Sequence, residues 1–215
     1  MRRRTYAAVL FDFNGTLSDD ESVLCELFID LFAEHGRPLS AQEYFDHLAG
    51  YSDPEIVRIW LGRDHPDVEA VIEERVKRYR AAVADGSTVH QHVRDAVRYA
   101  AERVPVGIVS GAARAEIEPV IDAAGLTQLF RAIVSSDDVA KGKPDPEGYL
   151  RALEQLDVPA EDVVVIEDTE AGVASAKAAG ARCLAVAGTL APERLAAADE
   201  LVERIDVELM RRLLG

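Results

Sequence analysis

The residues best suited to chemistry begin with a carboxylate that directly follows a short apolar segment. Asp12-Phe13-Asn14-Gly15-Thr16 places Asp12 beside a glycine and a hydroxyl side chain. A carboxylate in such a turn can act as a nucleophile and also bind a metal ion. Gly15 permits an unusual backbone dihedral or a close backbone approach. Taken alone, the string is explained equally well by an ordinary Asx turn.

A second polar cluster, Ser110-Gly111-Ala112, also follows an apolar segment. A serine hydroxyl and the next backbone amide, close to the start of a helix, are natural donors to phosphate oxygens. A plain N-cap serine is the alternative interpretation, and it is common.

The third cluster is a basic loop at residues 141–146, with the sequence Lys-Gly-Lys-Pro-Asp-Pro. Its prolines stiffen the loop and favour the start of a helix directly after it. A lysine held there could neutralise a phosphate oxygen together with the Asp12 carboxylate. The alternative is a solvated basic loop.

The fourth cluster, Glu167-Asp168-Thr169, places two carboxylates side by side. Adjacent carboxylates repel one another unless a cation or a lysine shares them. Hard oxygen ligands of this kind suit Mg²⁺. A helix N-terminus enriched in acids is the alternative, but it does not explain why four such clusters follow four apolar segments in order.

The elements that must position these clusters alternate between strands and helices. Buried strands are predicted at residues 6–11, 105–109, 132–134, 162–166 and 182–186. Helices are predicted between or after them at 92–103, 113–124, 146–156 and 170–179, with Gly125 and Gly180 as C-terminal caps. This alternation predicts an α/β fold with a parallel sheet. Ligands of such sheets bind outside the carboxyl ends of the strands, where the clusters lie.

Residues 18–86 interrupt the alternation with helical patterns alone, at 20–35, 41–49, 54–61 and 67–84. Nearly seventy helical residues directly after the first strand exceed an ordinary crossover connection. We therefore predict two domains: a core from residues 1–17 and 87–215, and a helical cap from 18–86. A helical subdomain with no part in the chemistry is the alternative.

Composition narrows the partners of this chain of 215 residues. The formal net charge of −15 argues against a nucleic acid or an anionic membrane surface as partner. No apolar run is long enough for a membrane span, and the segment Met1–Tyr6 lacks the features of a signal peptide. The cysteines, Cys25 and Cys183, are predicted to be reduced and buried. These features predict a cytoplasmic protein, and we expect a monomer or dimer. They do not exclude a small phosphorylated substrate, because local donors and a cation can outweigh a diffuse negative field.

The four clusters resemble the motifs of the haloacid dehalogenase-like (HAD) hydrolase superfamily, in particular its β-phosphoglucomutase and phosphoglycolate phosphatase branch. The Asp-x-Asp-Gly-Thr motif of that family reads Asp-Phe-Asn-Gly-Thr here. Ser110 matches the second motif, Lys143 in Gly-Lys-Pro matches the third better than Lys141, and Glu167-Asp168 matches the fourth. The resemblance covers nearly the whole chain. It implies a Rossmann-like parallel-sheet core with a small α-helical cap.

The resemblance also implies a role for each matching residue. Asp12 would attack phosphorus and become an aspartyl phosphate, while Ser110 and the amide of Gly111 hold the phosphoryl oxygens. Lys143 would bridge Asp12 and the phosphate, and Gly15 and Thr16 would contribute to substrate binding. Mg²⁺ would be bound by Asp12, the backbone carbonyl of Asn14 and Asp168, with Glu167 as a direct ligand or through water.

Asn14 departs from the pattern, because phosphatases and mutases of the family have an aspartate there as general acid and base. Loss of such a group typically costs about 10²–10⁴ in rate. Three interpretations follow: a phosphatase using another base or a good leaving group, an engineered Asp-to-Asn variant, and a phosphate-ligand binding protein with impaired chemistry. A phosphomutase depends most on the missing acid. His47 is a candidate substitute acid, and the cap loop Tyr51-Ser52-Asp53 is expected to face the substrate.

Overall fold

The computed structural model describes residues 5–215, and its centre is one six-stranded sheet in the order β3-β2-β1-β4-β5-β6. All neighbouring strands are parallel. The strands are β1 (Ala8–Phe11), β2 (Val106–Val109), β3 (Phe130–Val134), β4 (Val163–Glu167), β5 (Arg182–Val186) and β6 (Glu200–Val202). The predicted α/β fold is confirmed. The start of the segment used to exclude a signal peptide, residues 1–4, lies outside the described residues.

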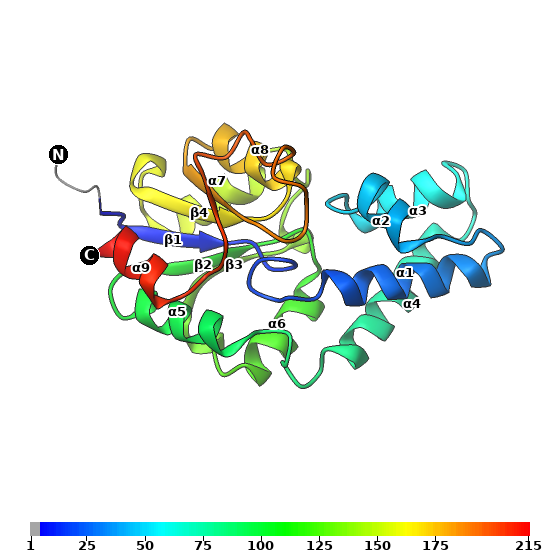
Figure 1. Cartoon of the computed structure of the whole chain (residues 1–215), viewed down its shortest axis with the longest axis horizontal. Helices are drawn as coiled ribbons and strands as arrows, with labels where there is room; N and C mark the ends of the chain where they lie inside the picture. Colours follow the sequence, from blue (N-terminus) through cyan, green and yellow to red (C-terminus); the bar gives the residue numbers. More distant parts are fainter. Residues whose placement is uncertain (1–4) are drawn as a thin grey trace.

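Helices cover both faces of the sheet (Figure 1). α7 (Glu147–Leu156) packs on β2 and β3, and α8 (Glu170–Ala178) packs on β4 and β5. On the other face lie α5 (Gln91–Ala101), α6 (Arg114–Ala123) and α9 (Val207–Leu214), with α9 packed against α5. Because both faces are covered, β1, β2 and β4 are buried along their whole length, which explains their continuous apolar sequences.

Five predicted strands and four predicted core helices occur with boundaries close to those expected, and β5 has the predicted limits. Gly125 and Gly180 follow α6 and α8 with φ of 68° and 85°, as helix-capping glycines do. Sequence analysis did not predict β6 or α9. β6 has three residues and pairs only with β5, so its pattern is too short to read.

Four helices follow β1 and form what we call the helical group: α1 (Glu21–Glu34), α2 (Ala41–His47), α3 (Asp53–Leu61) and α4 (Val68–Ala82). The group lies beyond the carboxyl end of β1, to the right in Figure 1. Aromatic side chains hold it together: Phe28 packs against Phe32 and Tyr44, and Phe32 stacks on Trp60. Ser40 and Glu43 form a capping box that fixes the start of α2.

No helix within residues 5–215 has both the length and the apolar character needed to cross a lipid bilayer. Cys25 and Cys183 are both buried and both free thiols.

Candidate active site

Strand register brings three of the four predicted clusters to one edge of the sheet. Phe11 of β1 pairs with Ile108 of β2 on one side and Ile166 of β4 on the other. The residues that follow these strands therefore meet: Asp12, Ser110 and the pair Glu167-Asp168. Backbone hydrogen bonds extend the ladder by one step, because the Asp12 amide donates to Ile166 at 2.9 Å and the Ser110 amide donates to Val134 at 2.9 Å.

Lys143 reaches into this edge from the loop before α7. Its Nζ lies 2.7 Å from Asp12 Oδ1 and 2.5 Å from Glu167 Oε1. Its side chain is 15% exposed, whereas that of Lys141 is 74% exposed and pairs only with Asp145 at 3.6 Å. Of the two lysines in the loop, Lys143 is the one that the fold places beside the carboxylates, as predicted.

Glu167 is fully buried and held by several donors. Tyr149 of α7 donates to Oε1 at 2.7 Å, in addition to Lys143. The amide of Asp168 and the hydroxyl of Thr169 donate to Oε2 at 3.1 and 3.3 Å. With both of its oxygens engaged, Glu167 is held in place and orients Lys143 beside Asp12.

Asp168 is held by two hydroxyls, from Thr16 at 3.0 Å and from Thr189 at 2.5 Å. The backbone of Gly15 passes directly over it with φ of 69°. A Cβ at this position would lie 2.0 Å from Asp168 Oδ2, so only glycine fits. Gly15 was expected to permit a close backbone approach, and the group it approaches is the carboxylate of Asp168, just after β4.

The electrostatics of this edge are unbalanced. Burial and repulsion from Glu167 raise the pKa of Asp12 to about 6, although the attraction and hydrogen bond of Lys143 oppose this rise. Burial and the charges of Asp12 and Glu167 raise the pKa of Asp168 well above its usual range. Burial alone would lower the pKa of Lys143, but its two carboxylate partners raise it instead. Ionisation of all three acids would set three carboxylates against one ammonium and leave two negative charges uncompensated, which is why burial and mutual repulsion raise the pKa values of Asp12 and Asp168.

One oxygen from each of Asp12, Glu167 and Asp168 lies within 4.8 Å of the others. Such a buried set of hard oxygen donors with excess negative charge fits a divalent cation. The arrangement would also place that cation next to the Asp12 carboxylate.

A cleft of about 680 Å³ opens between this edge and the helical group. Asp12, Asn14, Ser110, Gly111 and Lys143 line it together. A side chain at Gly111 would extend into open space, so the backbone there is accessible. Gly15 and Thr16 are not part of this cleft. They border a separate, smaller cavity, and the Thr16 hydroxyl is directed at Asp168.

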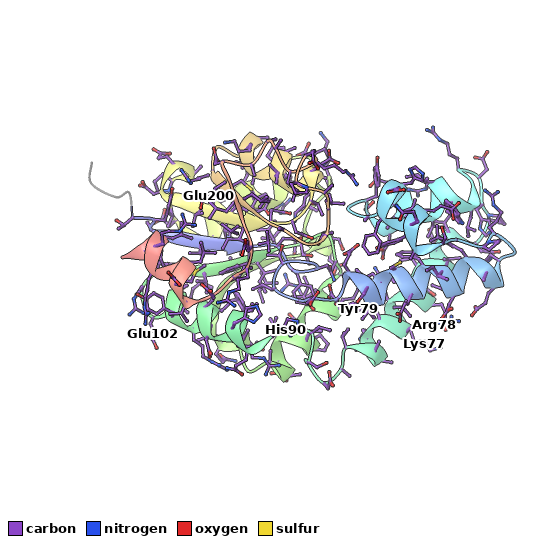
Figure 2. The ribbon with its side chains drawn as sticks, viewed as in Figure 1. Lys77, Arg78, Tyr79, His90, Glu102 and Glu200 are labelled. Atoms are coloured by element: carbon purple, nitrogen blue, oxygen red, sulfur yellow. The ribbon has the colours of Figure 1, made fainter. Side chains whose placement is uncertain are left out.

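Asn14 lies in the cleft with both protons of its amide engaged. Nδ2 lies 3.0 Å from Asp20 Oδ2 and 3.2 Å from the Tyr79 hydroxyl. Tyr79 in turn donates to Asp20, whose pKa burial raises to about 6. Tyr79 is located where α4 approaches the start of α1 (Figure 2). The remaining polar atom of Asn14, Oδ1, can accept a hydrogen bond but has no proton to give.

The helical group contributes the opposite wall of the cleft. Glu21, the first residue of α1, lines it and accepts a hydrogen bond from Tyr44 at 2.9 Å. Arg75 of α4 also lines it and forms ion pairs with Asp53 of α3 and Glu116 of α6. Arg75 and Glu116 are both buried, so this ion pair joins the helical group to the core.

Tyr51, Ser52 and Asp53 line the cleft, as expected from their place in the loop before α3. His47 does not line either cavity. Sequence analysis missed Asp20, Glu21, Tyr79, Arg75 and Glu116. The run Asp19-Asp20-Glu21 was a usable signal, because three consecutive acids just after the Asp12 motif are unusual. Nothing in the sequence links Tyr79 or Arg75 to this place.

The Haloacid dehalogenase-like hydrolase family model matches residues 9–186 of the chain. The chain belongs to this family. A Validoxylamine A 7'-phosphate phosphatase from Streptomyces hygroscopicus subsp. limoneus is 31% identical over 92% of this HAD chain and 93% of the relative. A Phosphoglycolate phosphatase from Pseudomonas putida is 29% identical over 82% of the chain and 67% of the relative. The protein is an enzyme of the phosphatase group of HAD hydrolases.

Solved structures agree with this assignment. CbbY from Rhodobacter sphaeroides, crystallised with phosphate, superposes with a TM-score of 0.85 at 28% identity, over 97% of this chain and 99% of CbbY. A putative beta-phosphoglucomutase from Thermotoga maritima gives a TM-score of 0.71 at 26% identity, over 96% and 99% of the two chains. The branch of HAD hydrolases that the motifs predicted is therefore confirmed.

Proposed function

We propose that this HAD hydrolase is a Mg²⁺-dependent phosphatase that cleaves a small phosphorylated metabolite through an aspartyl phosphate on Asp12. The main observation behind the proposal is the contact of Asp12 with Lys143 beside Glu167 and Asp168, at the bottom of a cleft lined by Ser110 and Gly111. Relatives named as phosphatases of small phosphorylated compounds support the substrate class.

In the first step an oxygen of Asp12 attacks phosphorus, and the bond from phosphorus to the leaving oxygen breaks. Since the pKa of Asp12 is about 6, the carboxylate is ionised at neutral pH. Lys143 holds this oxygen at 2.7 Å and offsets charge on the phosphoryl group. Ser110 and the Gly111 amide bind phosphoryl oxygens at the opposite side of the nucleophile.

In the second step water attacks the aspartyl phosphate, which releases inorganic phosphate and restores the Asp12 carboxylate. Asn14 Oδ1 can accept a hydrogen bond from this water and orient it, but it cannot remove its proton. The proton passes to solvent or to the departing phosphate. The same limit applies to the leaving oxygen in the first step, which receives no proton from Asn14.

Mg²⁺ would be held by Asp12, Asp168 and the backbone carbonyl of Asn14, with Glu167 contributing through water. When bound, it supplies the positive charge that a carboxylate nucleophile and a phosphate dianion both need. Asp12, Glu167 and Asp168 carry two more negative charges than Lys143 compensates when all three are ionised. This excess is the reason why the donor set fits a divalent ion.

We further propose that residues 18–86 act as a cap domain over residues 87–215 and the segment before residue 18. The helical group supplies one wall of the cleft, while the strand ends supply the other. Access of substrate then depends on movement of the group relative to the sheet.

The decisive experiment compares turnover of an aryl phosphate, acetyl phosphate and an alkyl phosphate with Mg²⁺, by the natural chain and by Asn14→Asp. We expect hydrolysis of the activated substrates by both proteins, and efficient alkyl phosphate hydrolysis only by Asn14→Asp. If neither protein hydrolyses any of the three substrates, the phosphatase proposal is wrong.

A second candidate is a phosphate-ligand binding protein, and one observation favours it. The Asn14 amide is locked by Asp20 and Tyr79, so no rearrangement of this side chain supplies a proton donor. Tight binding of phosphate or vanadate with no turnover of aryl phosphate would support this candidate. A phosphomutase reaction requires proton transfer at both transfer steps and is disfavoured by the same contacts.

A further inference from the structure

Within residues 5–215, the wall of the cleft formed by the helical group offers hydrogen-bond acceptors, and its one cation, Arg75, is already paired. We infer that this wall favours the binding of phosphate monoesters of hydroxyl-rich or amine-bearing alcohols, and disfavours those whose leaving group bears a second anion. The inference rests on the proposed phosphatase function and adds the chemical class of the leaving group.

The first support is a pair of acceptors, Asn14 and Glu21, that line the same cleft as the nucleophile. Asn14 has only Oδ1 available, because Asp20 and Tyr79 occupy its amide protons. Glu21 lines the same cleft and is close enough to Asp12 and Asp168 for its charge to affect their surroundings. A leaving group that passes between Asn14 and Glu21 must therefore present donors to both.

The second support is the fixed orientation of Glu21. Tyr44, which is buried and packs on Phe28, donates to Glu21 Oε1 at 2.9 Å. This contact leaves Oε2 as the acceptor available to a ligand. In its ionised form a carboxylate held in this way binds an ammonium or a hydroxyl strongly, because hydrogen bonds to charged groups are about twice as strong as neutral ones.

The third support is the state of the cations that line the cleft. Within residues 5–215 these are Arg75, Lys141 and Lys143. Arg75 is already paired with Asp53 and Glu116, and its side chain is only 4% exposed. If it turned to a ligand anion, it would abandon two carboxylates, one of them fully enclosed, which is costly.

The two lysines do not change this conclusion. Lys143 is engaged by Asp12 and Glu167 at the reacting end of the cleft. Lys141 is largely exposed, pairs with Asp145 at 3.6 Å, and lines the cleft from the loop before α7 rather than from the helical group. A second phosphate or a carboxylate on the leaving group would thus face Glu21 with no unpaired cation from the helical group beside it.

The test uses two series of phosphate monoesters that differ only in the charge of the leaving group. The first is ethanolamine phosphate, ethylene glycol phosphate and phosphoglycolate. The second is glucosamine phosphate, glucose phosphate and gluconate phosphate. Inhibition constants are measured against aryl phosphate hydrolysis by the full chain with Mg²⁺, and dissociation constants by calorimetry provide a second measurement that does not require turnover.

We expect the amine to bind most tightly and the carboxylate most weakly in at least one series, with the two extremes separated by about tenfold or more. Glu21→Gln should reduce the advantage of the amine to less than about threefold. Glu74→Gln, which removes an acid of α4 outside the cleft, is the control for net charge and should leave the ranking unchanged.

Tighter binding of the carboxylate in both series, or an unchanged ranking in Glu21→Gln, would overturn the inference. These results are distinguishable from failure of the proposed function. In that case aryl phosphate is not hydrolysed, whereas the calorimetric ranking still tests whether the wall selects donors over anions.

Discussion

The sheet and the helical group treat buried charge in opposite ways. At the strand ends, Asp12, Glu167 and Asp168 share one cation, Lys143, and remain two negative charges in excess. Where the helical group meets the core, hydrogen bonds from Tyr79 and Asn14 satisfy Asp20, and Arg75 lies between Asp53 of α3 and Glu116 of α6. The first arrangement is incomplete without a cation and an electrophile. In the second, each of these charged groups has a partner, some of them supplied by the core, and this arrangement suits the selection of a leaving group.

Removing the nucleophile should produce the largest effect, since it destroys the chemistry of the strand ends while the helical wall stays intact. We expect Asp12→Asn to lower kcat for aryl phosphate by at least about 10⁴-fold, as for other nucleophile deletions. Binding of inorganic phosphate, measured by calorimetry with Mg²⁺, should persist. Residual turnover within tenfold of the natural chain would assign the nucleophile to another residue.

Exchanging Asn14 and Asp20 tests whether the active site lacks a proton donor because residue 14 is an amide hydrogen-bonded to Asp20. Asn14→Asp alone places two carboxylates at a separation of 3.0 Å, where they must share a proton. The double variant Asn14→Asp/Asp20→Asn keeps one acid and one amide. We expect it to raise kcat/KM for an alkyl phosphate by about 10²–10⁴-fold, equivalent to roughly 3–5 kcal/mol.

The single variant Asp20→Asn is the control for this exchange and should not gain alkyl phosphatase activity. If the double variant is no faster than the natural chain on alkyl phosphates, the missing acid at residue 14 is not what limits the enzyme.

Breaking the ion pairs of Arg75 tests how much these buried contacts contribute to the stability of the fold. Arg75→Met leaves Glu116, which is 2% exposed, and Asp53 without their cation. We expect a loss of about 3 kcal/mol in the free energy of unfolding, measured by urea denaturation at neutral pH. Arg78→Met on the same helix removes an exposed pairing with Glu34 and should cost less than about 1 kcal/mol.

Figure 2 labels Arg78 on α4, next to α1, the helix that contains Glu34. Equal losses of unfolding free energy in Arg75→Met and Arg78→Met would show that burial does not distinguish the two ion pairs. This result would contradict the proposed difference between the buried pairs of Arg75 and the exposed pair of Arg78.

The smallest expected effect concerns Glu21 and pH. Burial, opposed by the hydrogen bond from Tyr44, raises the pKa of Glu21 from 4.5 to about 7. The folded state therefore favours the protonated acid, and stability declines as pH rises from about 4.5 to about 7. Relative to Glu21→Gln, the natural chain should lose about 1–2 kcal/mol over this interval, because the cleft partly exposes the side chain.

Urea denaturation of both proteins at intervals across this pH range measures the difference. A difference that is constant with pH, or that grows in favour of the natural chain, would show that Glu21 is not disfavoured as a carboxylate.

The residues at the strand ends could be assembled from sequence because each follows an apolar segment. Parallel pairing then brings Asp12, Ser110 and Glu167 together without further information. Lys143 was identifiable, in preference to Lys141, from its match to the Gly-Lys-Pro pattern of the HAD family. What strand pairing could not reveal is the direction of each side chain, so Thr16 was expected at the substrate but donates to Asp168 instead.

The helical side resisted prediction for a different reason. The contacts of Tyr79 with Asn14 and of Arg75 with Glu116 span 65 and 41 residues. They depend on how α4 crosses α1 and α6, and helical periodicity predicts a buried face but not its polar partners. α9 was missed although its apolar residues, Leu209, Met210 and Leu213, recur at helical spacing, and only its packing partner, α5, lies far away in the sequence.

The ion pair between Arg75 and Glu116 also limits how freely parts of this fold can be recombined. Its two halves belong to α4 and α6, so a transplant of residues 18–86 onto a related sheet would take the guanidinium and leave the glutamate behind. A chimera built in this way needs a glutamate at the equivalent place on the recipient. Although the helical group is continuous in sequence, it depends on one helix of the core, α6, for the partner of a buried arginine.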